Sequence, residues 1–94
     1  PVFTLGVILF ELCTSRRLFK RATPIETYEA IQKGEVPDPC SVSPQVSRHV
    51  GDVILKALAR NKDERYLTAE AMQEALELAM RRSGRKGRPL DLSR

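Results

Sequence analysis

Residues 2–14 constrain the fold more than any other segment, because the run VFTLGVILFELCT is apolar at almost every position. A buried strand would also be rich in Val and Ile, but a run of this length favours a helix. A helix that is apolar around its whole circumference is surrounded by protein on all sides. The run is too short to span a bilayer, which needs about 20 apolar residues, and it carries Glu11. We therefore expect a core helix.

A second helix has clear start and stop signals. Thr23 and Glu26 form a capping box with Pro24 at the first helical position, and Gly34 supplies the residue that tolerates a left-handed C-terminal cap. The predicted helix therefore covers residues 24–33. Its apolar face comprises Ile25, Tyr28 and Ile31.

Residues 35–44 contain three prolines and are predicted to form an extended surface loop. Ser43 is expected to cap a third helix, with Pro44 at its first position. The apolar stripe of that helix comprises Val46, Val50, Val53, Ile54, Ala57 and Leu58.

Residues 60–66 form a polar connection, and Thr68 is expected to cap a fourth helix that has Glu70 in its first turn. The inner face of this helix comprises Met72, Ala75, Leu76, Ala79 and Met80. Glycines and a proline follow residue 82. The sequence thus predicts an all-α fold of four helices over residues 1–81 and a basic, flexible tail over residues 82–94.

The positive charge is concentrated at the end of the chain. From residue 81 onward there are six basic residues and one acid, a charge of +5, whereas the rest has ten basic and eleven acidic residues, a charge of −1. No aromatic residue lies in the tail to stack on bases. We expect only weak, salt-sensitive contact with polyanions there, through phosphate groups.

Neither cysteine belongs to a metal-binding or redox motif. Cys13 and Cys40 show no C-x-x-C spacing, and His49 adds no complete zinc set. Two thiols in a reducing cytoplasm are expected. His49, in the third helix, is expected to face solvent. No nucleophile motif accompanies it, and a hydrolase is not indicated.

Three segments, in the right order, resemble the C-terminal lobe of protein kinases. The run VFTLGVILFEL with Thr14 and Phe19 resembles the long central helix of that lobe, ETYEAIQKGEVPDP resembles the next helix and its loop, and KALARNKDERYLTAEAMQEAL resembles the closing segment. Leu5-Gly6 and the R-Y-x-T-A ending favour the Ser/Thr branch, of the bacterial eukaryotic-like type. Departures from the family pattern are Pro1, Ser15, Leu18 and Lys62.

This resemblance implies a parent enzyme that transfers phosphate from ATP, with Mg²⁺, to protein Ser or Thr. The Gly-rich loop, the strand lysine, H-R-D-x-x-x-x-N, D-F-G and A-P-E are all absent from this chain. Phosphoryl transfer depends on positioning ATP, metal and hydroxyl together. We therefore predict no catalytic, cofactor-binding or metal-binding residue in this chain, and no activity of the chain alone.

The resemblance also assigns roles to first-helix residues. Ile8 and Leu12 match the two residues beneath the hydrophobic spine on the adenine side, and simple core filling is the alternative. Glu11 matches an acid that binds a substrate arginine in some kinases, and a helix carboxylate satisfied by a neighbour is the alternative.

Arg65 matches the arginine that pairs with the A-P-E glutamate, and a solvated loop arginine is the alternative. Since this chain has no A-P-E glutamate, Arg65 is expected to reach solvent or to pair with Asp63 or Glu64. Arg65→Ala should then change the stability of the chain little.

Other functions remain open at this point. The chain is either a kinase segment whose partner is the rest of the domain, a free-standing helical module that binds a protein, or a basic-tailed binder of nucleic acid or anionic surfaces. A cytoplasmic location is expected. Three amphipathic helices can cover only part of the first helix, so a patch around Phe3, Val7 or Phe10 is expected to drive self-association.

Overall fold

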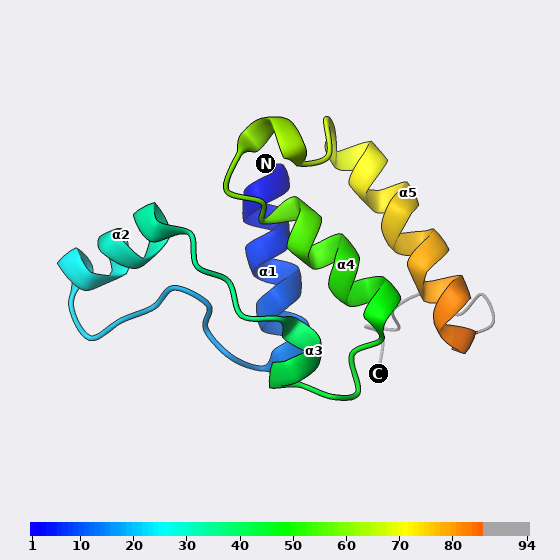
Figure 1. Cartoon of the computed structure of the whole chain (residues 1–94), viewed down its shortest axis with the longest axis horizontal. Helices are drawn as coiled ribbons and strands as arrows, with labels where there is room; N and C mark the ends of the chain where they lie inside the picture. The colour runs from blue at the N-terminus through cyan, green and yellow to red at the C-terminus, as the bar shows by residue number, and fades with distance from the viewer. Residues whose placement is uncertain (86–94) are drawn as a thin grey trace.

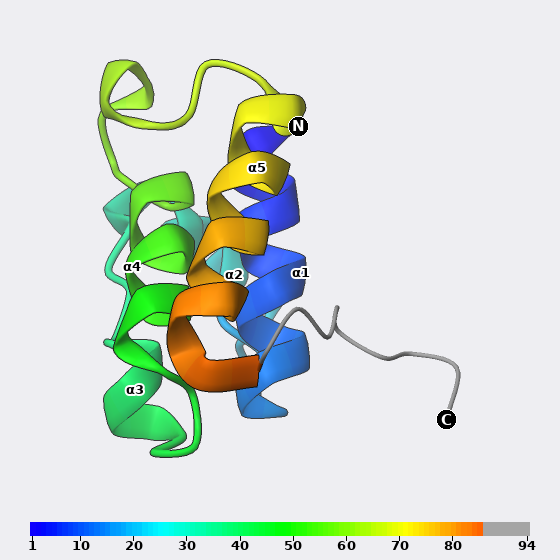
Figure 2. The ribbon, with the colours of Figure 1, turned by 90° about the vertical axis from the view of Figure 1, so that its right-hand side faces the viewer.

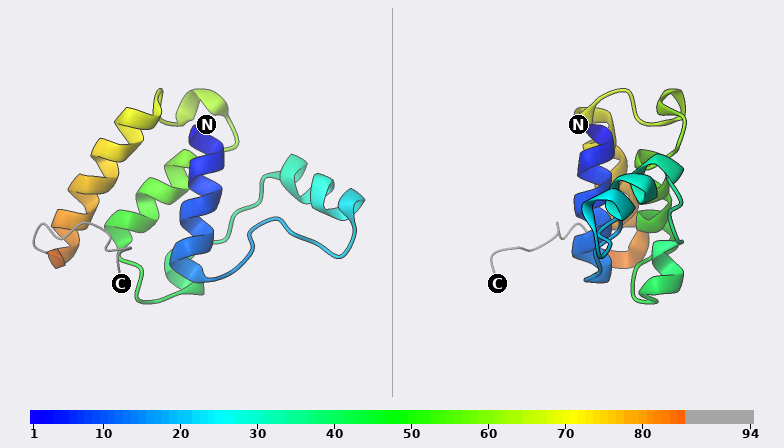
Figure 3. Two further views of the ribbon diagram at one scale, coloured as in Figure 1. Left: turned by 180° about the vertical axis from the view of Figure 1, so that it is seen from behind. Right: turned by 90° about the vertical axis from the view of Figure 1, so that its left-hand side faces the viewer.

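The computed structural model describes residues 1–85, which form helices joined by loops and turns, without a strand in that range. The predicted all-α class is confirmed. Helices α1 (Val2–Thr14), α4 (Arg48–Ala57) and α5 (Ala69–Met80) pack into one body (Figure 1). Helix α2 (Pro24–Lys33) projects to one side, as the view from behind also shows (Figure 3). The short elements are α3 (Pro39–Val42), η1 (Lys62–Glu64) and η2 (Arg81–Arg85).

Helix α1 has the predicted boundaries and ends at a left-handed residue. Ser15, at φ 58°, donates its backbone N–H to the carbonyl of Glu11 at 2.8 Å. In mid-helix, Gly6 allows α1 to approach α4 closely. A Cβ at Gly6 would lie 2.9 Å from the Cβ of Ala57 and 3.0 Å from Leu58, so a larger residue would push the two helices apart.

Helix α2 also has its predicted ends. The Thr23 hydroxyl accepts a hydrogen bond from the N–H of Glu26 at 3.1 Å, and Gly34 takes the left-handed conformation at φ 65°. No residue of α2 is fully buried, and Ala30 is its one side chain that packs against the core. The helix is therefore held mainly by its caps and flanking loops.

Two predictions about the proline-rich connection are wrong. Pro39 is fully buried and begins α3 inside the segment expected to be an extended surface loop. The cap of α4 is Ser47, whose hydroxyl accepts from the N–H of Val50 at 3.1 Å, and not Ser43. Ser43 is itself buried in the turn between α3 and α4. Burial of Pro39 and Ser43 is a tertiary effect that local propensity does not report.

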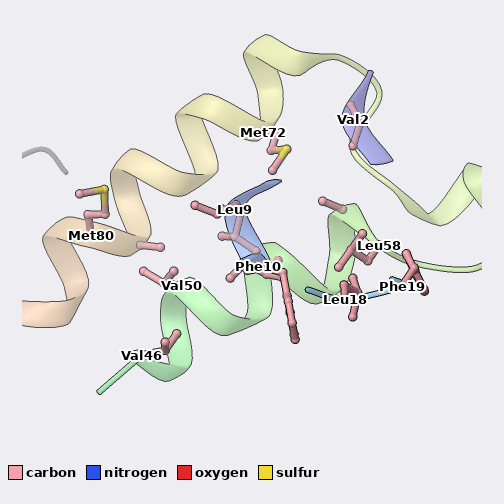
Figure 4. Close-up of a cluster of buried hydrophobic side chains, with 14 residues drawn as sticks. Val2, Leu9, Phe10, Leu18, Phe19, Val46, Val50, Leu58, Met72 and Met80 are labelled. Atoms are coloured by element: carbon pink, nitrogen blue, oxygen red, sulfur yellow. The ribbon is translucent and has the colours of Figure 1, made fainter. Parts of the chain in front are cut away.

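Helix α5 begins where predicted, with the Thr68 hydroxyl accepting from the N–H of Ala71 at 3.0 Å. It packs along α4, beside α1 (Figure 2). The core contains side chains from α1, the loop after it, α4 and α5 (Figure 4). Its buried apolar residues are Val2, Leu9, Phe10, Leu18, Phe19, Val46, Val50, Val53, Ile54, Ala57, Leu58, Met72, Ala79 and Met80.

The packed body continues slightly past α5. In η2, the Ser83 hydroxyl lies 2.9 Å from that of Ser47 and also donates to the carbonyl of Ala79. The predicted flexible tail falls mainly on residues 86–94, which lie outside the described residues.

Candidate functional site

An apolar groove of about 290 Å³ lies between α1 and α5. Its α1 wall exposes three large apolar side chains: Leu5 is 39% exposed, Ile8 48% and Leu12 58%. Their spacing of three and four residues places them on one face of the helix. The complete lining is Leu5, Ile8, Leu9, Leu12, Ala69, Met72, Gln73 and Leu76. The groove thus presents a mostly apolar surface to solvent, and exposed apolar patches can mark places where another surface packs.

Ile8 and Leu12 therefore do not fill the core of this chain, and that alternative is wrong. The reason is geometric. Helices α4 and α5 cover only the side of α1 that carries Gly6, Leu9 and Phe10. The place of Ile8 and Leu12 beneath a hydrophobic spine stays a prediction of the resemblance.

Glu11 has a local partner. Its Oε2 accepts a hydrogen bond from the backbone N–H of Leu18 at 2.9 Å, and the residue is half-buried. The carboxylate thereby fixes the turn after α1, as expected for a carboxylate satisfied by a neighbour. A substrate arginine would have to share this carboxylate with Leu18.

Arg65 is held within the chain by backbone carbonyls and an aromatic ring. Its Nε donates to the carbonyl of Ala59 at 2.7 Å, and Nη2 donates to that of Arg60 at 3.4 Å. The guanidinium carbon lies 4.7 Å from the centre of the Phe3 ring. The expected pairing with Asp63 or Glu64 is wrong, because carbonyls just past the end of α4 are unsatisfied acceptors that lie within reach.

The remaining polar candidates do not form a reactive centre. His49 is exposed, as predicted. The Cys40 thiol donates to the carbonyl of Ser47 at 3.4 Å, and burial raises its pKa above the usual range, which disfavours the reactive thiolate. Within residues 1–85, no three His, Cys, Asp or Glu side chains are grouped so that they could hold a metal ion.

Comparisons with known proteins give one consistent result, although no protein-family profile matches the chain. Over 91 residues it is 36% identical to the tyrosine-protein kinase MasK of Myxococcus xanthus, which covers 95% of this chain. It is 38% identical to the Ser/Thr-protein kinase Pkn1 of the same species, over 94% of the chain. With the Ser/Thr-protein kinase PrkC of Bacillus subtilis, identity is 33% over 83% of the chain.

The chain is related to the bacterial protein kinases. It spans only 12–14% of the length of these relatives, as expected for a segment of a larger protein. The helical fold agrees with part of a kinase C-lobe. None of the helices within residues 1–85 of this kinase segment has the length and apolar character needed to cross a membrane.

Sequence reasoning missed two features of the kinase segment. The groove could have been recognised from the positions of Leu5, Ile8 and Leu12 on one face, although which face lacks a partner depends on the tertiary fold. The second feature is a bidentate ion pair: Arg48 donates from Nη1 and Nη2 to the two carboxylate oxygens of Asp38 at 2.7 and 2.9 Å. The Nε of Arg48 also donates to the carboxylate of Asp52 at 3.0 Å.

The Asp38–Arg48 pair joins the start of α3 to α4. Asp38 also accepts from the backbone N–H of Cys40 at 3.1 Å and so caps α3. The pKa of Asp38 is lowered from 3.8 to about 2. The hydrogen bond from Arg48 is the largest cause, and the bond from the N–H of Cys40 is the second. Both effects favour the charged carboxylate.

We expect this ion pair to make the stability of the kinase segment fall as the pH is lowered. A carboxylate whose pKa is lower in the folded state than in the unfolded state stabilises the folded state at any pH above the pKa of the unfolded state. This contribution is lost as the pH falls through the pKa of the folded state. The relevant window runs from pH 3.8 down to about 2. Urea unfolding at several pH values should show a steeper loss for the wild type than for Asp38→Asn or Arg48→Gln. An equally steep loss in both variants would contradict this.

For Arg65, the observed contacts change the expected mutational effect. Arg65→Ala removes a charged hydrogen bond and the contact with the Phe3 ring, which together should destabilise the segment by about 1–3 kcal/mol. Lys62→Ala, an exposed neighbour, should stay within about 0.5 kcal/mol of wild type. Urea unfolding of both variants measures the difference. Equal stabilities would mean that the Arg65 contacts contribute nothing net.

Proposed function

We propose that this chain is the C-terminal part of the C-lobe of a Ser/Thr protein kinase domain and serves as its rigid base. The whole protein would transfer phosphate from ATP to Ser or Thr residues of proteins in the cytoplasm. In this proposal the chain alone is inactive, and its partner is the rest of the kinase domain. Leu5-Gly6 and the Arg65-Tyr66-x-Thr-Ala pattern support the Ser/Thr branch, although one of the relatives is named a tyrosine kinase.

The single observation that carries this proposal is the uncovered groove between α1 and α5. It exposes Ile8 and Leu12, the positions that the resemblance places beneath the hydrophobic spine. A segment that fills a small share of much longer kinases should have such a surface wherever the remainder packs against it. We assign the groove to a helix of the remaining domain.

The residues of this chain do not fit an ATP or Mg²⁺ site. Its five glycines are scattered singly, so no glycine-rich loop can wrap phosphates. The described residues also lack a cluster of acidic ligands for a cation. In the proposed parent, ATP and Mg²⁺ are held by the remaining domain, and no step of phosphoryl transfer is assigned to this chain.

Two calorimetric titrations with Mg-ATP test this function. The chain alone should show no saturable binding. A chimera that joins it to the N-terminal part of the PrkC kinase domain should bind Mg-ATP at one site and phosphorylate a protein substrate. Saturable micromolar binding by the chain alone would contradict the proposal, and so would a folded chimera that binds no nucleotide.

A second candidate function is a free-standing docking module, favoured by the exposure of α2. Its apolar face is open to solvent, with Ile25 72% exposed, Tyr28 64% and Ile31 42%. If the chain works by itself, it should be a monodisperse monomer with cooperative melting and dispersed amide spectra. If it is a piece of a lobe, association or loose packing is expected instead.

A further inference from the structure

The loop between α1 and α2 carries a second basic cluster, separate from the C-terminal tail. Residues 15–22 contain Arg16, Arg17, Lys20 and Arg21 and no acid. All four side chains are exposed. This loop runs from the end of α1 to the projecting α2 (Figure 1).

The loop is anchored by the two apolar residues at its centre. Leu18 and Phe19 are each only 5% exposed and belong to the core (Figure 4). The Phe19 ring stacks on that of Phe3, with centroids 6.0 Å apart. In the sequence R-R-L-F-K-R, the central Leu-Phe pair is therefore buried in the core, and the basic pair on each side of it is exposed to solvent.

Three backbone N–H groups of the loop donate hydrogen bonds to side-chain oxygens of the flanking helices. The N–H of Arg16 donates to the Thr14 hydroxyl at 3.3 Å, and that of Leu18 donates to Glu11 at 2.9 Å. Farther along, the N–H of Arg21 donates to the Thr27 hydroxyl at 2.9 Å. A surface that is already fixed loses less conformational entropy when a partner binds.

The charge of this loop is not balanced by local ion pairs. Within residues 1–85, both ion pairs are made by Arg48, far along the chain in α4. The nearest acid bonded to the loop, Glu11, is half-buried beneath it and occupied by the N–H of Leu18. Four like charges on a fixed loop repel one another, and an anionic partner would relieve that repulsion.

We propose that this loop is a docking surface for a polypeptide segment rich in Asp and Glu. Three of the four basic residues are arginines, whose planar guanidinium groups suit bidentate contact with carboxylates. The four charges are spread over six residues of the loop, which suits several carboxylates in succession better than one small anion. Nucleic acid fits less well, because the one aromatic residue of the loop, Phe19, is buried and cannot stack on bases.

The test measures binding of a fluorescently labelled peptide of alternating Glu and Ser to the full chain, by anisotropy. The loop variant combines Arg16→Ser, Arg17→Ser and Lys20→Ser. Arg21 is kept because its guanidinium donates to the carbonyls of Leu18 and Lys20. We expect the loop variant to bind about tenfold more weakly, as for the loss of three exposed ion pairs.

The matched control removes the same charge from the end of the chain, through Arg82→Ser, Lys86→Ser and Arg88→Ser. It should keep the affinity within about twofold. Equal losses in both variants, or no peptide binding by the wild type, would overturn the proposal. So would a DNA strand of equal charge that binds more tightly and depends on the same three residues. Circular dichroism checks that both variants are folded, and no outcome depends on phosphoryl transfer.

Discussion

Phe10→Ala should remove most of the stability of this chain, whereas Leu12→Ala, two residues farther along α1, should leave it nearly unchanged. Phe10 is 1% exposed at the centre of the core, and Leu12 is 58% exposed. Truncating a fully buried Phe typically costs about 3–5 kcal/mol. Small domains are stable by only about 5–15 kcal/mol, with short chains near the lower end. The exposed leucine should cost about 0.5 kcal/mol or less.

Urea unfolding followed by circular dichroism would measure both variants against the wild type. Leu12→Ala is the matched control, because it truncates a large apolar side chain on the same helix. A similar loss in both variants would mean that the Leu12 side of α1 is covered in solution, for example by a second copy of the chain. Repeating the measurement at several protein concentrations would reveal such association.

Local sequence signals predicted the ends of most helices because capping is a local interaction. Thr23 and Thr68 accept from backbone N–H groups three residues on, within their own helices. Gly34 ends α2 through its own backbone conformation. None of these contacts needs information from distant parts of the chain.

The start of α4 shows where local signals fail. Ser43 followed by Pro44 has the same pattern as Thr23 followed by Pro24, yet the helix begins after Ser47. The difference arises from packing: Pro39 is buried in α3, and Asp38 is bound to Arg48 in α4. The burial of Pro39 and the ion pair of Asp38 with Arg48 both depend on how the chain packs, so a local sequence pattern cannot predict them.

The prediction that α1 has an exposed apolar face is correct, but the residues predicted to form that face are not the exposed ones. The expected patch centred on Phe3, Val7 and Phe10, yet Phe10 is buried and the other two pack against the core. The orientation of α1 is fixed where Gly6 meets Ala57 and Leu58 of α4. That contact turns Phe10 inward. A helix that is apolar on all sides carries no periodicity from which its orientation could be read.

The groove itself gives the sharpest test of the kinase-lobe proposal, through Ile8→Glu. In the chain alone Ile8 is 48% exposed, so a carboxylate there remains hydrated and should change stability by about 1 kcal/mol or less. It should also weaken self-association by adding charge to the apolar surface. In the chimera with the N-terminal part of the PrkC domain, the proposed helix covers the groove. An unpaired buried charge then costs several kcal/mol.

Leu67→Glu is the matched control, because Leu67 is 93% exposed and lies outside the groove. It should be neutral in both the chain and the chimera. Thermal unfolding of the four variant proteins, with Mg-ATP binding as a second readout of the chimeras, gives the comparison. If Ile8→Glu leaves the chimera as stable as Leu67→Glu does, the groove stays open to water in the whole domain. The apolar face of α1 would then serve another partner, and the assignment of the groove to the remaining kinase domain would be wrong.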